Sequence, residues 1–117
     1  MKFQFICYSK CSTCTKAKKW LEANHIEFEE RPIKDKNPTV DELREWIPKS
    51  GYPIKRFFNT SGKIYRDLNL KDRLPQMTGE EQVKLLATDG MLVKRPILVG
   101  DDIVLVGFKE EEWKQIL

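Results

Sequence analysis

Three cysteines lie close together near the N-terminus, at Cys7, Cys11 and Cys14, and the chain contains no others. Their C-x3-C-x2-C spacing is compatible with a metal cluster, a structural bridge or disulfide exchange. Radical enzymes that use S-adenosylmethionine hold a [4Fe–4S] cluster at this spacing, but they need a large barrel, for which 117 residues are too few. The only histidine, His25, follows the first predicted helix, roughly 15 Å from its start. We therefore expect no metal site.

The pair formed by Cys11 and Cys14 suits exchange chemistry. Cys11 stands at a predicted strand-to-helix turn, where free N–H groups and the helix dipole lower a thiol pKa from about 8.5. Lys10 beside it adds positive charge if its side chain turns inward. Cys14 lies one turn further on, where it can attack a mixed disulfide on Cys11. We therefore interpret Cys11 as the attacking thiol and Cys14 as the resolving thiol; the alternative is two unreactive thiols. Cys7 belongs to an apolar strand and is expected to be buried and inert.

Local patterns predict the elements that position these thiols. Residues 2–8, KFQFICY, are typical of a buried strand. Residues 13–24 follow with the periodicity of a helix that has Cys14 and Leu21 on one face. From residue 25 onward, Ile26 and Phe28 alternate with glutamates, which predicts a second strand that ends at Pro32. The resulting strand–helix–strand unit is long enough for a right-handed parallel crossover.

The middle of the chain, about residues 38–92, is predicted to be a helical insertion. Thr39 and Thr78 each stand three positions before a glutamate, the pattern of a capping box at a helix start. Gly51 and Gly90 are placed where glycine ends helices.

The remaining segments complete the predicted topology. Residues 54–70 look irregular, and residues 68–74 favour a short helical turn. Residues 95–99 and 103–108 predict a hairpin, and residues 109–117 a final helix with glutamates at its start. The chain is therefore expected to be α/β, a four-stranded mixed sheet with flanking helices and a helical insertion between its βαβ and ββα halves.

Composition sets the broad class of the protein. With 40% hydrophobic and 33% charged residues, the 117-residue chain is expected to form one soluble domain, residues 1–117, as a monomer. No apolar run approaches the roughly 20 residues of a membrane span, and the N-terminus lacks a cleavage signal, so we expect a cytoplasmic protein. In that compartment a permanent structural disulfide is unusual. The net charge of +3 comes without a basic arm, which argues against direct binding of nucleic acid.

The segment YSKCSTCTKAKKWLE, with KRPILV and LVGF near the C-terminus, resembles the arsenate reductase (ArsC) family, and most of all its Spx/MgsR branch. The resemblance extends over essentially the whole chain, including FFNTSGKIYRDLNL. It implies a thioredoxin-like fold, a catalytic Cys11, and an Arg95 beside the active site. It also implies a cis bond before Pro96, which turns backbone groups toward Cys11. Arg95 would serve there as an anion site, the alternative being a solvated arginine at a strand start.

We accordingly expect substrate to be bound by Lys10, Ser12, Thr13, Arg95 and Pro96. The resemblance implies thiol-dependent reductase chemistry without a bound cofactor. Glutathione, bacillithiol and thioredoxin are all compatible with it as electron donors.

The chain departs from the arsenate-reducing members of the family. In the arsenate reductases that this chain resembles, three arginines surround the catalytic cysteine, which suits a multiply charged oxyanion. Here Arg95 is the one match, while Asn59 and Gly107 stand at the other two positions and Arg56 has a different spacing. We therefore expect poor arsenate reduction and favour a thiol–disulfide oxidoreductase.

A second function is kept open by the same resemblance. The regulators of the Spx/MgsR branch use their cysteine pair as an oxidation sensor and bind the RNA polymerase α subunit. Gly51 falls where they have a glycine in that contact, although a helix stop accounts for it equally well. Because Leu117 falls inside the last predicted helix, we expect the chain to do without the extra C-terminal segment of the type member, which argues against the regulator.

Overall fold

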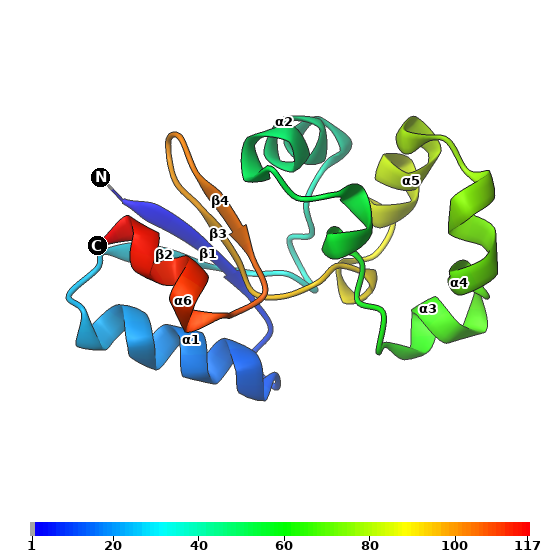
Figure 1. Cartoon of the computed structure of the whole chain (residues 1–117). Helices are drawn as coiled ribbons and strands as arrows, with labels where there is room; N and C mark the ends of the chain where they lie inside the picture. The colour runs from blue at the N-terminus through cyan, green and yellow to red at the C-terminus, as the bar shows by residue number, and fades with distance from the viewer. Residues whose placement is uncertain (1) are drawn as a thin grey trace.

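Four strands form one mixed sheet in the order β2-β1-β3-β4 in the computed structural model, which describes residues 2–117 (Figure 1). The strands are β1 (Phe3–Cys7), β2 (Phe28–Pro32), β3 (Ile97–Val99) and β4 (Val104–Val106). β2 pairs parallel to β1, with Phe28 opposite Phe3, and β3 pairs antiparallel to β1, with Leu98 opposite Phe5. β4 closes the hairpin antiparallel to β3. The predicted four-stranded mixed sheet is confirmed.

Helices connect and flank these strands. One helix joins β1 to β2, a block of helices separates β2 from β3, and the last helix follows β4 (Figure 1). The α-helices are α1 (Ser12–Ala23), α2 (Val40–Ser50), α3 (Lys63–Asp67), α4 (Leu70–Arg73), α5 (Gly79–Leu86) and α6 (Glu110–Trp113). Short 3₁₀ helices span Ile54–Phe57, Leu74–Gln76, Gly90–Leu92 and Lys114–Ile116. Among residues 2–117, no helix combines the length and the apolar character needed to cross a membrane.

Both predicted capping boxes are present. The hydroxyl of Thr39 accepts from the N–H of Glu42, whose carboxylate accepts in return from the N–H of Thr39. Thr78 and Glu81 repeat the arrangement at the start of α5. Gly51 ends α2 with a left-handed backbone, φ +74°, as predicted.

Several boundaries differ from the sequence-based expectation. β2 begins only at Phe28, because the N–H groups of His25 and Ile26 bond back to carbonyls of α1. The segment expected to be irregular contains the 3₁₀ helix Ile54–Phe57 and α3. Gly90 does not end α5, which stops at Leu86. Its α-carbon instead packs against the chain after β2: a Cβ there would lie 1.8 Å from the carbonyl oxygen of Ile33.

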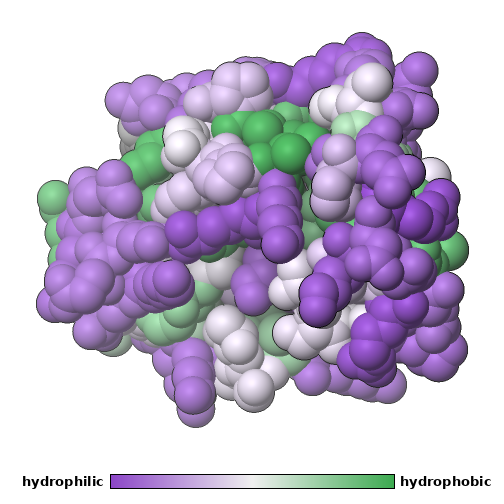
Figure 2. All heavy atoms as spheres, turned by 45° about the vertical axis from the view of Figure 1, so that its right-hand side comes forward, coloured by the Kyte–Doolittle hydropathy of each residue, from purple (hydrophilic) through white to green (hydrophobic). Residues whose placement is uncertain are grey.

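The sheet separates two hydrophobic clusters. On one face, Phe5 and Cys7 of β1 pack with α1 and with Trp113 of α6. On the other face, Ile6 packs with the helical block between β2 and β3. Outside these clusters the molecule is polar: the face seen in Figure 2 is mostly hydrophilic, with apolar side chains visible in recesses between charged ones. The three cysteines lie around the junction between β1 and α1, on the α1 side of the sheet.

Candidate active site

Cys11 occupies the N-cap position of α1, with an extended backbone at φ −101° and ψ 120°. The turn that delivers it is closed by a 3.0 Å hydrogen bond from the N–H of Cys11 to the carbonyl of Tyr8. The carbonyl of Cys11 then accepts the first bond of the helix, from the N–H of Thr15 at 3.1 Å. The cysteine side chain therefore stands where a helix has backbone donors without helical partners.

The surroundings of Cys11 favour its thiolate. Burial by itself would raise the pKa, since the side chain is half-buried. Hydrogen bonds from the backbone N–H groups of Cys14 and Thr13, a bond with the thiol of Cys14, and the charge of Arg95 outweigh that effect. Together they hold the pKa of Cys11 below its ordinary value, which is the condition for a nucleophilic thiol near neutral pH.

The other two cysteines are placed differently. Both are buried and all three are free thiols. Burial raises the pKa of Cys14 to about 12, despite a hydrogen bond from the backbone N–H of Tyr8. Burial and the charge of Glu30 raise the pKa of Cys7 to about 11. Among residues 2–117, no three His, Cys, Asp or Glu side chains are grouped as metal ligands.

Arg95 and Pro96 come from the other half of the chain, and the charge of Arg95 acts on the Cys11 thiol. The bond between them is cis, as the resemblance implied. The carbonyl of Pro96 accepts from the N–H of Gly107 at 2.8 Å, which ties the start of β3 to the end of β4. The Arg95 guanidinium carbon lies 5.2 Å from the centre of the Tyr8 ring, and its Nη1 donates to the carbonyl of Met91 at 3.4 Å. Its Nε is buried and has no hydrogen-bond partner among residues 2–117.

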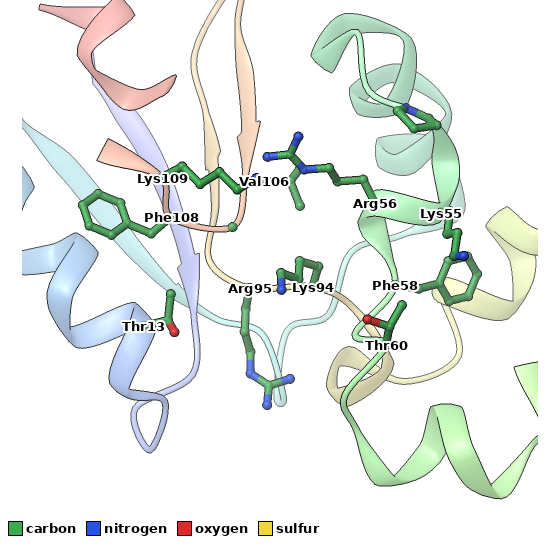
Figure 3. A pocket seen from close by; sticks show the side chains of 12 residues that line it. Thr13, Lys55, Arg56, Phe58, Thr60, Lys94, Arg95, Val106, Phe108 and Lys109 are labelled. Atoms are coloured by element: carbon green, nitrogen blue, oxygen red, sulfur yellow. The ribbon is translucent and has the colours of Figure 1, made fainter. Parts of the chain in front are cut away.

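A cavity of about 580 Å³ opens beside this arginine (Figure 3). Its lining includes Arg95 and four further cationic side chains, with Thr13 from the start of α1. Figure 3 shows Arg56 and Lys55 on the side of the helical block, Lys109 on the opposite side, and the Lys94–Arg95 pair between them. The lining residues are Thr13, Pro53, Lys55, Arg56, Phe58, Thr60, Lys94, Arg95, Val106, Gly107, Phe108 and Lys109.

The structure gathers only some of the residues expected to bind substrate. Thr13 and Arg95 line the large cavity together, and both act on the Cys11 thiol. Lys10 instead lines a separate cavity of about 490 Å³, which it shares with Cys7. Ser12 is exposed at the start of α1, and Pro96 is buried. Whether each of them contacts substrate stays a prediction.

The sequence reasoning missed Lys55, Lys94 and Lys109, and it set Arg56 aside because of its spacing. All four lie in the lining of the same cavity as Arg95. Lys94 had a usable signal, since it directly precedes the expected anion-binding arginine. The others come from distant segments, and no local pattern connects them to the cysteines.

Gly107 explains one of the missing arginines in physical terms. Its φ is +73°, a conformation that side chains rarely adopt, and an added Cβ would lie 3.3 Å from the Lys94 side chain. Its carbonyl accepts from the indole N–H of Trp113 at 2.9 Å. Both the N–H and the carbonyl of Gly107 are therefore hydrogen-bonded. The positive charge near this residue comes from Lys94 and Lys109.

Comparison with known proteins places the chain among relatives of similar length. The model of the ArsC family matches residues 7–116. The uncharacterized protein YusI of Bacillus subtilis is 49% identical over 98% of both chains. A crystal structure of an ArsC family related protein from Bacteroides fragilis is 59% identical, with a TM-score of 0.98 over 100% of this chain and 98% of that one. The regulatory protein MgsR of B. subtilis is 33% identical over 92% of this chain and 84% of its own.

Proposed function

We propose that this chain, which belongs to the ArsC family, is a thiol–disulfide oxidoreductase whose working pair is Cys11 and Cys14. The observation that carries the proposal is the opposite perturbation of two thiols one helical turn apart. The pKa of Cys11 is lowered by backbone N–H groups and Arg95, whereas burial raises the pKa of Cys14 to about 12. In such a pair, Cys11 is the more readily ionised thiol and attacks first, while Cys14 stays protonated until the mixed disulfide has formed.

The reaction we propose has two steps. The Cys11 thiolate attacks one sulfur of a substrate disulfide, forming a Cys11–substrate disulfide and releasing the other half as a thiolate. Cys14 then attacks the Cys11 sulfur, its proton passes to the departing thiolate, and a Cys11–Cys14 disulfide forms. The substrate gains two electrons and the two cysteines lose them. An external thiol reductant, of the glutathione, bacillithiol or thioredoxin kind, would return the pair to its reduced state in the cytoplasm.

Arg95 is proposed to orient the substrate rather than to exchange electrons. Its charge lowers the pKa of Cys11, and Arg95 lines the large cavity. Arg95→Ala should therefore raise KM for a disulfide substrate with an acidic group, by roughly fivefold to tenfold, while the fold is kept. Arg95→Lys should recover only part of the loss, because lysine lacks the planar donor fork.

Arsenate is a poor fit to this proposal. A tetrahedral oxyanion needs several cations converging on one point. The cationic side chains of the cavity instead come from opposite sides of it, and Arg56 already pairs with Glu112 at 2.7 Å. We expect the chain to reduce arsenate slowly with any thiol donor.

One parallel assay tests the proposal. Wild type, Cys11→Ser, Cys14→Ser and the control Cys7→Ser are each given arsenate and the neutral 2-hydroxyethyl disulfide. Wild type and Cys7→Ser should reduce the disulfide, Cys11→Ser should be inactive, and Cys14→Ser should accumulate the mixed disulfide on Cys11, visible by mass spectrometry. Disulfide reduction that survives Cys11→Ser would refute the assignment. Efficient arsenate turnover would refute the substrate preference.

The likeness to MgsR supports a second candidate, a redox-sensing regulator that binds the RNA polymerase α subunit. In this chain Gly51 has the left-handed backbone that a tight surface turn requires. The test is a pull-down of purified α subunit by wild type and by Gly51→Arg. Retention of the α subunit by wild type alone, together with no turnover of any disulfide, would favour the regulator over the enzyme.

A further inference from the structure

The charged side chains that line the cavity of Thr13 and Arg95 are all cationic. Five of its lining side chains are cationic and none is acidic. Within residues 2–117 only Arg56 among the five has an ion pair, with Glu112. Lys55, Lys94 and Lys109 form no salt bridge in that part of the chain. Like charges brought together without counter-charges repel one another, so an anionic ligand would stabilise the arrangement.

The charges are distributed along the cavity. They come from three separate segments: the 3₁₀ helix Ile54–Phe57, the chain before β3, and the turn before α6. Figure 3 shows their side chains on opposite sides, with Arg95 near Thr13 and the start of α1. A volume of about 580 Å³ falls in the roughly 300–1,000 Å³ range of cavities that enclose an organic ligand. A single small oxyanion would leave most of this space and most of these cations unused.

Neutral donors and apolar surface add to the charges. Thr13 and Thr60 line the cavity, and so do the apolar residues Phe58 and Val106. A smaller cavity of about 210 Å³, with Ile54 and Leu74 among its lining residues, has Pro53 and Lys55 in common with the large one. A ligand along this path would meet cations beside Cys11 and apolar side chains further on.

We propose that the cavity binds an extended, acidic segment of a partner protein, with its carboxylates on Lys94, Arg95 and Lys109 and an apolar side chain toward Ile54. An extended chain advances about 3.3 Å per residue, so acidic residues on both sides of a cysteine would reach cations on both sides of the cavity. The inference rests on the proposed function for the chemistry at Cys11. The recognition itself requires no redox step and can be measured without one.

Binding of two labelled peptides to reduced protein tests the inference. The first is fluorescein-Glu-Asp-Ser-Asp-Glu-Leu, with serine in place of cysteine, and the second replaces its acidic residues by their amides. Fluorescence anisotropy should show at least tenfold tighter binding of the acidic peptide. This preference should largely vanish in about 1 M salt, where the Debye length is about 3 Å.

Two matched double variants locate the site. Lys94→Gln with Lys109→Gln should weaken binding roughly fivefold to thirtyfold, equivalent to about 1–2 kcal/mol. Lys16→Gln with Lys19→Gln removes the same charge from the exposed surface of α1 and should leave the affinity within about twofold. Circular dichroism confirms that all variants are folded.

Three outcomes would overturn the inference: equal binding of both peptides, equal weakening by both double variants, or stronger competition from a single-stranded oligonucleotide of equal charge. Exchange with 2-hydroxyethyl disulfide, which carries no charge, is measured alongside on wild type. If exchange proceeds while the acidic peptide is not preferred, the inference fails and the proposed function stands. If the acidic peptide binds selectively but no disulfide exchange is seen, the proposed function fails and the inference about recognition stands.

Discussion

The backbone N–H of Tyr8 donates a hydrogen bond to the sulfur of Cys14 at 3.4 Å. This bond joins the residue after β1 to the first turn of α1, and it holds the Cys14 sulfur at that junction. A donor at this distance favours the Cys14 thiolate, but burial outweighs it and the pKa is raised to about 12. Cys14 therefore keeps its proton while Cys11 is the more acidic thiol.

Alkylation should follow this order. At pH 7 a thiol of pKa about 11 is ionised to the extent of about 10⁻⁴, so Cys7 and Cys14 should react with iodoacetamide far more slowly than Cys11. Mass spectrometry of native protein over a pH series gives each rate, and the unfolded protein, in which all three should react alike, is the control. Faster labelling of Cys7 or Cys14 near pH 7 would reverse the assigned roles.

Mild oxidation should produce one specific bridge. Cys11 and Cys14 stand at the cap and in the first turn of one helix, which suits the short Cα separation of a disulfide. Peptide mapping after peroxide treatment should therefore recover the Cys11–Cys14 pair, and Cys7→Ser should give the same result. A dominant bridge to Cys7 would be incompatible with the proposed exchange.

Acid should destabilise the protein through Glu42. Arg31 donates to both of its carboxylate oxygens, at 2.7 and 2.8 Å, and this pairing holds the pKa of Glu42 below its usual range. The contribution to stability is complete above the unfolded value of about 4.3 and is lost as pH falls through the folded pKa.

Substitution at this carboxylate isolates the effect. Glu42→Gln keeps a side chain suited to the capping box but removes the charge, so it should cost about 1–2 kcal/mol in urea unfolding at pH 7 and less at about pH 3. Glu45→Gln, which removes an exposed pair with Lys49, should cost under about 0.5 kcal/mol at either pH. An equal loss for Glu42→Gln at both pH values would contradict the linkage.

Two glycines should respond to alanine in opposite ways. Gly90→Ala places a Cβ 1.8 Å from the Ile33 carbonyl oxygen, so the backbone must move, at a cost of about 2–4 kcal/mol. Gly79, the first residue of α5, has no atom within 4 Å of the added Cβ, and Gly79→Ala should stabilise by up to about 1 kcal/mol. Thermal and urea unfolding measure both, and a neutral Gly90→Ala would disprove the close approach.

Local signals in the sequence account for much of this fold. The apolar, aromatic-rich composition of β1 and the capping boxes at Thr39 and Thr78 are each complete within a few residues, so they could be recognised without the rest of the chain. The structure of the segment after Gly51 was harder to predict, because it depends on hydrogen bonds to residues distant in the sequence. The N–H of Asn59 donates to the carbonyl of Leu92, and that of Lys94 to the carbonyl of Phe57, both at 2.7 Å.

The site divides in the same way. Cys11 could be identified from its neighbours and Arg95 from the resemblance. The cationic cavity could not, since Arg56 and Lys109 meet only because the helical block folds back toward the end of β4. Glu112 also links the helical block to α6, because its carboxylate accepts hydrogen bonds from both Arg56 and Tyr52 at 2.7 Å.

The side chains of β1 alternate between the two faces of the sheet, and this alternation fixes the face on which Cys7 lies. Phe5 and Cys7 face α1 and α6, while Ile6, between them, faces the helical block. A slip of one position in strand pairing would exchange these faces completely, sending Cys7 toward the helical block and Ile6 toward α1. Intermediate placements do not exist in a pleated strand. The register of β1 therefore decides whether Cys7 shares the α1 side of the sheet with Cys14 or lies against the helical block.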